Sequence, residues 1–100
     1  MDRRTRRARA RAQTKLVRDQ ERLARLQPGG EPGRPLTVDS PAQIEIIAAA
    51  SPCPLCGGTL RLDEHAAETA GTVRLRVARL TCTACRTPRD IWFRLAAALH

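Results

Sequence analysis

Apolar and polar side chains alternate along two runs in the C-terminal half of the chain, at residues 59–63 and 72–80, and the mostly apolar run at 91–95 offers a third strand. A side-chain period of two is typical of a β-strand with one buried face. The sequence therefore predicts three strands in this half. In the second run the apolar set changes face near Ala78, which indicates a bulge before the strand ends.

The N-terminal segment, residues 1–27, has the composition of a helix. Alanine, arginine, glutamine and leucine all favour helix, and neither glycine nor proline occurs before Pro28. Repulsion between arginines three and four positions apart opposes the helix weakly. Leu16, Leu23 and Leu26 form a narrow apolar stripe on one side, which would suit a partner helix or the rest of the chain.

A second, shorter helix is predicted from Ser40 to about Ala50. Ser40 suits the N-cap, Pro41 suits the first helical position, and a glutamine three residues after the serine completes a capping box. Residues 28–39 precede this helix, and three prolines with three glycines occupy positions 28–35. We therefore expect a linker at 28–39, between a helical arm at 1–27 and a domain at 40–100.

Composition limits how this domain can be stabilised. The chain has 100 residues with one tryptophan and one phenylalanine, which is too few for a large apolar core. Four cysteines occur as two pairs of the same spacing, Cys53/Cys56 and Cys82/Cys85. Two such pairs, separated by enough residues for a hairpin, match the ligands of tetrahedral Zn²⁺. The sequence therefore predicts a structural zinc ion bound by all four.

Other uses of the cysteines remain open at this point. Two disulfides or a redox-active dithiol would use the same residues, and four thiolates can also hold an iron–sulfur cluster. No hydrophobic stretch follows the basic N-terminus and no run of 18 apolar residues occurs, so we expect neither a secretory signal nor a membrane span. A cytoplasmic, reducing location would favour metal. We expect His65 and His100 to be ordinary surface residues, because four thiolates complete the coordination.

The segment Cys53-Pro-Leu-Cys56-Gly57-Gly58, followed by Cys82-Thr-Ala-Cys85, resembles a zinc ribbon. The resemblance covers about the last half of the chain and implies a three-stranded antiparallel sheet around one metal. In that family a glycine follows the second cysteine of a knuckle, which Gly57 matches and Arg86 does not. The predicted fold is thus a small, metal-stabilised α+β protein: a three-stranded antiparallel zinc ribbon preceded by a short helix and a basic N-terminal helix.

The knuckle spacing also resembles the ribbons of transcript-cleavage elongation factors and small polymerase subunits. Cleavage in those proteins depends on an acidic pair at the hairpin tip. Here Asp63 and Glu64 fall on the outgoing strand, and the expected tip at residues 65–71 contains only Glu68. The sequence offers no catalytic set and no phosphate-cradling loop, so we expect neither an enzyme nor a small-molecule substrate.

The net charge of +8 is concentrated at the N-terminus, where residues 1–27 contribute ten basic against three acidic residues. A cluster of arginines without aromatic neighbours is suited to phosphate contacts without base reading. We therefore predict an adaptor that contacts nucleic acid, or a ribonucleoprotein or polymerase-type complex. A protein-interaction module that binds through the leucine stripe is the alternative. The predicted nucleic-acid contacts are Arg3, Arg4, Arg6, Arg7, Arg9 and Arg11.

Two weaker signals lie in the strands. Arg74 and Arg76 share one face of the second strand and, with Arg61, would form a basic sheet face, although alternating charges are typical of a solvated surface. Trp92 and Phe93 must point to opposite sides of the third strand. We expect one of them in the core and the other at a contact surface.

Overall fold

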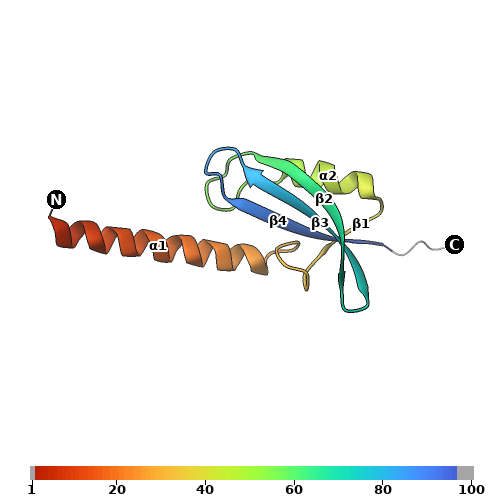
Figure 1. Cartoon of the computed structure of the whole chain (residues 1–100), viewed down its shortest axis with the longest axis horizontal. Helices are drawn as coiled ribbons and strands as arrows, with labels where there is room; N and C mark the ends of the chain where they lie inside the picture. The colour runs from red at the N-terminus through yellow and green to blue at the C-terminus, as the bar shows by residue number, and fades with distance from the viewer. Residues whose placement is uncertain (1, 97–100) are drawn as a thin grey trace.

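The computed structural model describes residues 2–96 and shows two helices and one four-stranded sheet (Figure 1). The sheet has the strand order β1-β4-β3-β2. Strands β2, β3 and β4 are antiparallel, and β1 runs parallel to β4. The elements are α1 (Arg3–Leu26), β1 (Leu36–Val38), α2 (Pro41–Ala50), β2 (Leu60–Ala70), β3 (Val73–Cys82) and β4 (Pro88–Leu95).

The fourth strand corrects the sequence-based prediction of three. Leu36 of β1 pairs with Phe93 of β4, and Val38 pairs with Leu95, so β1 extends the sheet beyond β4. Val38 is 5% exposed and belongs to the core. This strand lies inside the segment predicted as a linker, and its partner is more than fifty positions away, so the local pattern does not report the pairing.

The hairpin of β2 and β3 is longer than predicted. Ala70 pairs with Val73, which leaves only Gly71 and Thr72 in the turn. Most of the expected tip, residues 65–71, therefore belongs to β2. The register shifts between Leu62 and Glu64, so the bulge lies in β2 and not in β3.

Strand β3 keeps its register along its length and has apolar residues on both faces. Ala78, Leu80 and Cys82 belong to the main core cluster, whereas Leu75 and Val77 are buried outside it. Residues on both faces of β3 are therefore buried, and this accounts for the change in the apolar pattern that suggested a bulge in β3.

Helix α2 covers one face of the sheet and completes the core (Figure 1). Its N-terminus follows the expected capping pattern, because the Gln43 side-chain oxygen accepts a hydrogen bond from the Ser40 amide at 3.2 Å. Ile44 and Ala48 are fully buried against Leu80 and Phe93, while Ile46 stays 70% exposed. Phe93 is thus the buried member of the aromatic pair, and Trp92 is half-buried.

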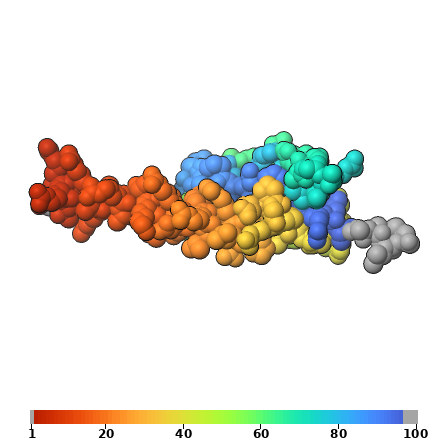
Figure 2. Space-filling model, turned by 90° about the horizontal axis from the view of Figure 1, so that it is seen from below, coloured from red at the N-terminus to blue at the C-terminus, as the bar shows by residue number. Residues whose placement is uncertain are grey.

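Helix α1 projects from the sheet, and only its C-terminal part lies beside the rest of the molecule (Figures 1 and 2). None of its described residues is buried. The helix is joined to β4 by Glu21, whose carboxylate accepts two hydrogen bonds from the Arg89 guanidinium at 3.1 and 3.2 Å. These side chains are 25% and 12% exposed. One ion pair thus fixes how α1 meets the sheet.

The segment between α1 and β1 also contacts β4. The Trp92 amide donates a hydrogen bond to the Gly29 carbonyl oxygen at 2.8 Å, and the Gly29 amide donates to the Arg34 carbonyl oxygen. Gly29 is buried although it lies in a proline- and glycine-rich stretch. The sequence favours a connection that lets the arm reorient, whereas the structure holds this segment along the edge of β4.

Neither helix combines the length and the apolar character needed to cross a membrane. Helix α1 is long enough but strongly charged, and α2 has only 10 residues.

Candidate metal centre and basic surfaces

Both cysteine pairs lie in or next to short loops at one end of the sheet. Cys53 and Cys56 occupy the loop between α2 and β2, whereas Cys82 is the last residue of β3 and Cys85 lies in the loop that follows it. Because β2 and β3 are antiparallel, the start of one lies beside the end of the other, which brings the two loops together. The Thr83 amide and hydroxyl both donate to the Thr59 carbonyl oxygen at 2.9 Å and link the loops.

The two loops have the same backbone hydrogen bonds. In the first, the Cys53 amide donates to the Gly58 carbonyl at 2.9 Å and the Gly57 amide donates to the Cys53 carbonyl at 2.8 Å. In the second, the corresponding bonds from Cys82 to Thr87 and from Arg86 to Cys82 are both 3.0 Å. Each loop therefore closes into a tight turn that presents its two sulfurs to the same side.

The four sulfurs all lie within 4.8 Å of one another. Across the loops, Cys53 Sγ is 3.7 Å from Cys85 Sγ and Cys56 Sγ is 3.5 Å from Cys82 Sγ. Sulfurs bound at about 2.3 Å around a tetrahedral ion are about 3.8 Å apart. A disulfide requires about 2.05 Å. The geometry is therefore that of a metal-binding knuckle pair, compatible with an ion such as zinc.

The centre lies at the border between core and solvent. Cys53 and Cys82, the first cysteine of each pair, are buried in the core, while Cys56 and Cys85 are exposed. Gly58 lies against the cluster, since a Cβ atom there would be 3.0 Å from Cys82 Sγ and 3.2 Å from Cys56 Sγ. A side chain at this position would therefore press on two of the sulfurs.

The surroundings affect the cysteines differently. Hydrogen bonds with the Thr87 hydroxyl and the Thr87 amide lower the pKa of Cys85 to about 6. The Gly58 amide acts to lower the pKa of Cys56, but hydrogen bonding with the other sulfurs, Cys82 first, raises it to about 11. The Cys85 and Ala84 amides lower the pKa of Cys82. Because only thiolates bind metal, an ion entering this cluster must displace protons.

The residue type at the left-handed position distinguishes the second knuckle from the first. Gly57 has φ 75° and Arg86 has φ 65°, so both residues adopt the left-handed conformation. A residue with a side chain is less stable there by about 1–2 kcal/mol. The departure from glycine noted in the sequence therefore occurs at a position where glycine would be favoured.

Comparison with known proteins adds no relative to this picture. No family model, no curated protein and no solved structure matches the chain. The assignment of the site therefore rests on the arrangement of the cysteines themselves.

The acidic residues of the hairpin do not gather at its tip. Asp63 occupies the bulge, where hydrogen bonds from the Thr81 hydroxyl and from Arg61 lower its pKa. Glu64 and Glu68 both pair with Arg79, at 3.2 and 2.9 Å. Each of these carboxylates is thus engaged within the sheet.

The histidine of β2 lies apart from the cysteine cluster. His65 is 13% exposed at its side chain, and its Nδ1 atom is 3.6 Å from a carboxylate oxygen of Glu45 in α2. His65 therefore packs between β2 and α2 and is not the surface residue that the sequence suggested. His100, the other histidine, lies outside the described residues.

All six arginines predicted to contact nucleic acid lie on α1 and are exposed. None of them forms an ion pair with any residue in 2–96. The Asp2 side chain caps this helix by accepting a hydrogen bond from the Thr5 amide at 2.8 Å. The leucine stripe is exposed as well, because Leu16, Leu23 and Leu26 are 50%, 59% and 49% exposed.

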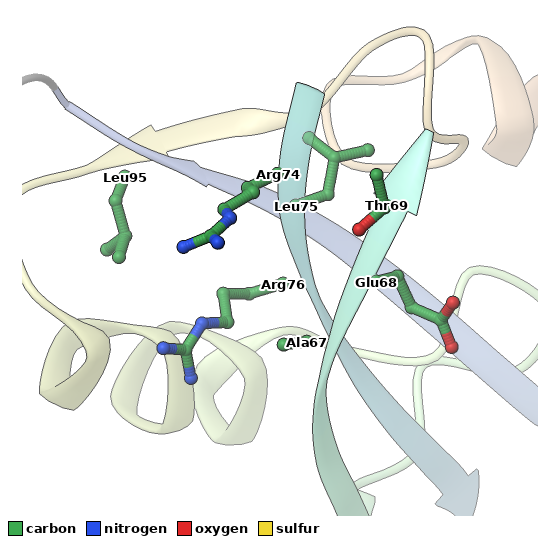
Figure 3. Close-up of a pocket in the computed structure, with 7 residues that line it drawn as sticks. All are labelled: Ala67, Glu68, Thr69, Arg74, Leu75, Arg76 and Leu95. Atoms are coloured by element: carbon green, nitrogen blue, oxygen red, sulfur yellow. The ribbon is translucent and has the colours of Figure 1, made fainter. Parts of the chain in front are cut away.

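The predicted basic face of the sheet is smaller than expected. Arg74 and Arg76 point to the same side of the hairpin, toward Leu95, whereas Glu68 points away from them (Figure 3). Arg61 pairs across the sheet with Thr81 and therefore lies on the opposite face, where it forms an ion pair with Asp63 at 3.1 Å. Two arginines, and not three, remain on this surface.

Proposed function

We propose that the protein is a non-enzymatic zinc-ribbon adaptor that contacts nucleic acid, or a nucleic-acid-bound complex, through helix α1. The observation that carries the proposal is the combination of a four-sulfur cluster at one end of the sheet with an exposed, arginine-rich helix that projects from the sheet. The cluster supplies a rigid base and the helix supplies the contact surface.

Zinc is the metal that the cluster fits best. Two cysteine pairs in matching turns, at the end of an antiparallel hairpin, support a zinc ribbon, and tetrahedral thiolate coordination is typical of Zn²⁺. With four sulfurs the coordination is complete, so the ion would hold the two loops together and leave no position for water. Free thiolates require a reducing compartment, and we therefore place the protein in the cytoplasm.

The charge of α1 supports an anionic partner. Six exposed arginines between Arg3 and Arg11 form no ion pair with any of the described residues, so their charge is available. Arginines bind phosphate through paired N–H groups, and neutralising phosphates releases counterions. Binding of this kind depends steeply on salt and little on base sequence.

The test replaces the six arginines from Arg3 to Arg11 with glutamine, which keeps the helix propensity. We expect the parent to bind DNA or RNA at low salt and the variant to lose most of that affinity, with unchanged zinc content. Each phosphate contact contributes about −0.9 to the log–log salt slope on duplex DNA. A control variant, Arg74→Gln/Arg76→Gln, should bind nearly as the parent does. If only the control variant loses affinity, the sheet surface is the site; if the parent does not bind, the proposal fails.

A second function is favoured by the exposed leucine stripe. Leu16, Leu23 and Leu26 are about half exposed on a helix with no buried residue, which suits contact with a partner helix. Affinity purification with and without nuclease tests this alternative. A partner that survives nuclease treatment, and that is lost in Leu16→Ser/Leu23→Ser but kept in the six-arginine variant, would support the interaction module. A partner that disappears with nuclease supports the adaptor.

A further inference from the structure

The basic residues of α1 extend beyond the N-terminal arginine cluster and are regularly spaced on one face of the helix. Successive residues of an α-helix are turned by about 100°, so side chains three and four positions apart lie on one face. Seven cations recur at this spacing along the whole helix and fall within a sector of about 80°. We call them the basic stripe: Arg4, Arg7, Arg11, Lys15, Arg18, Arg22 and Arg25.

The stripe is exposed along its full length. All seven residues are solvent-exposed, and Lys15 alone forms an ion pair with another residue in 2–96, at 3.1 Å from Asp19. At a rise of 1.5 Å per residue, the stripe from Arg4 to Arg25 is about 32 Å long. The helix therefore presents a straight row of positive charge rather than a flexible basic tail.

Contacts with the sheet set the direction in which the stripe points. Four residues of α1 are partly buried, and one of them, Asp19, pairs with Lys15. The other three, Gln20, Glu21 and Ala24, mark the docked side, where the bidentate pair with Arg89 holds Glu21. The centre of the stripe lies about 130° around the helix from this docked side. Most of the stripe thus faces away from the sheet, while Arg25 at its C-terminal end lines a groove with Trp92 of β4. Much of α1 extends beyond the body of the molecule (Figure 2).

We propose that α1 binds lengthwise to duplex DNA with the basic stripe facing the phosphates. This inference rests on the proposed nucleic-acid function and specifies duplex DNA as the ligand. A duplex carries one negative charge per about 1.7 Å of axis, twice the density of one strand, and it is stiff over the length of the stripe. A straight row of positive charges can contact a stiff duplex along its length, and the duplex loses little conformational entropy because it is already straight.

The composition of α1 argues against two other ligands. Single strands are bound by aromatic side chains that stack on bases, and α1 contains no aromatic residue. A helix that lies on a membrane needs an apolar face along its length, yet residues 3–15 contain no apolar side chain larger than alanine.

The test compares two variants that remove the same charge from the same helix. Arg11→Gln/Arg18→Gln/Arg22→Gln removes three members of the stripe. Arg3→Gln/Arg6→Gln/Arg9→Gln removes the three arginines of the proposed contact set that lie outside the stripe and point to other sides of α1. It is the matched comparison, because contact by the whole arginine cluster predicts equal losses in the two variants and contact by the stripe predicts unequal losses. Fluorescence anisotropy then measures binding to a duplex of about 20 base pairs, two turns of DNA, and to one of its strands, across a salt series.

We expect the parent protein to bind the duplex more tightly than it binds the single strand. The stripe variant should lower the magnitude of the duplex salt slope by about 2.7, three contacts at about 0.9 each, and the control variant by less than about 1. Helical content and zinc content should equal the parent's in both. Equal losses in the two variants, or equal affinity of the parent for duplex and single strand, would overturn this inference and leave the proposed function standing. Absence of binding to either ligand at low salt would overturn both.

Discussion

At the scale of single residues, the two knuckles differ in how well each fits its backbone conformation. Gly57 and Arg86 occupy equivalent positions with φ 75° and 65°. The side chain of Arg86 makes this conformation less stable by about 1–2 kcal/mol. Metal binding in small zinc peptides contributes about 10–16 kcal/mol, so a metal-loaded protein tolerates the difference.

Exchanging these residue types should therefore change stability in opposite directions. Arg86→Gly should raise the free energy of unfolding by up to about 1 kcal/mol, and Gly57→Ala should lower it by about 1 kcal/mol. No atom lies within 4 Å of a Cβ built at Gly57, so backbone strain alone acts there. Denaturant unfolding of the metal-loaded protein at fixed free zinc measures both. Changes of the same sign would contradict this account of the second knuckle.

Gly58 tests the packing around the sulfurs. Gly58→Ala would place a methyl group about 3 Å from two cysteine sulfurs, which must then move apart. We expect metal affinity to fall by about 10-fold, the range seen when groups next to metal ligands are altered. Competition with a chromophoric chelator gives the affinity. Gly57→Ala, which touches no sulfur, should bind metal much more tightly than Gly58→Ala; equal affinities would show that the contact does not matter.

At the scale of secondary-structure elements, the sequence predicted those features that depend on interactions between residues close together in the chain. The start of α2 follows from Ser40, Pro41 and Gln43, which cap its N-terminus, and the equal spacing of the cysteine pairs agrees with two matching turns. Strand β1 was missed because it is stabilised by pairing with β4, and a short run after prolines and glycines gives no such signal. The full length of β2 was obscured because the bulge at Asp63 breaks the alternation and the following residues are mostly polar or small.

The ion pair between α1 and β4 was equally invisible in the sequence, because Glu21 and Arg89 are 68 positions apart. It determines how the basic stripe is presented. Arg25 of α1 and Trp92 line the same groove, so the single tryptophan can report whether α1 is docked.

Glu21→Gln should therefore release α1 from the sheet. Loss of the charged hydrogen bonds costs about 1.5–3 kcal/mol of docking free energy, and Trp92 emission should shift to longer wavelength as the groove opens. Lys15→Gln is the matched control, since its ion pair with Asp19 is exposed and within one helix. Unchanged emission in Glu21→Gln, or an equal shift in the control, would show that this pair does not hold the arm.

At the scale of the whole molecule, the protein is an elongated body, 67 × 26 × 16 Å along its principal axes, with the cysteine cluster at one end of its sheet. The core is small, and two of the four cysteines belong to it. The cluster joins the loop before β2 to the loop between β3 and β4, so it connects three of the four strands. A metal there would therefore stabilise most of the sheet, including the strand on which α1 docks.

Metal analysis of protein purified under reducing conditions tests this account most directly. We predict one zinc ion per chain, loss of the near-UV circular dichroism of Trp92 on chelation, and the same loss in Cys53→Ser. A chain without metal that keeps its near-UV spectrum, or one that contains iron with visible absorption in place of zinc, would contradict the central claim that four cysteines hold a structural zinc ion.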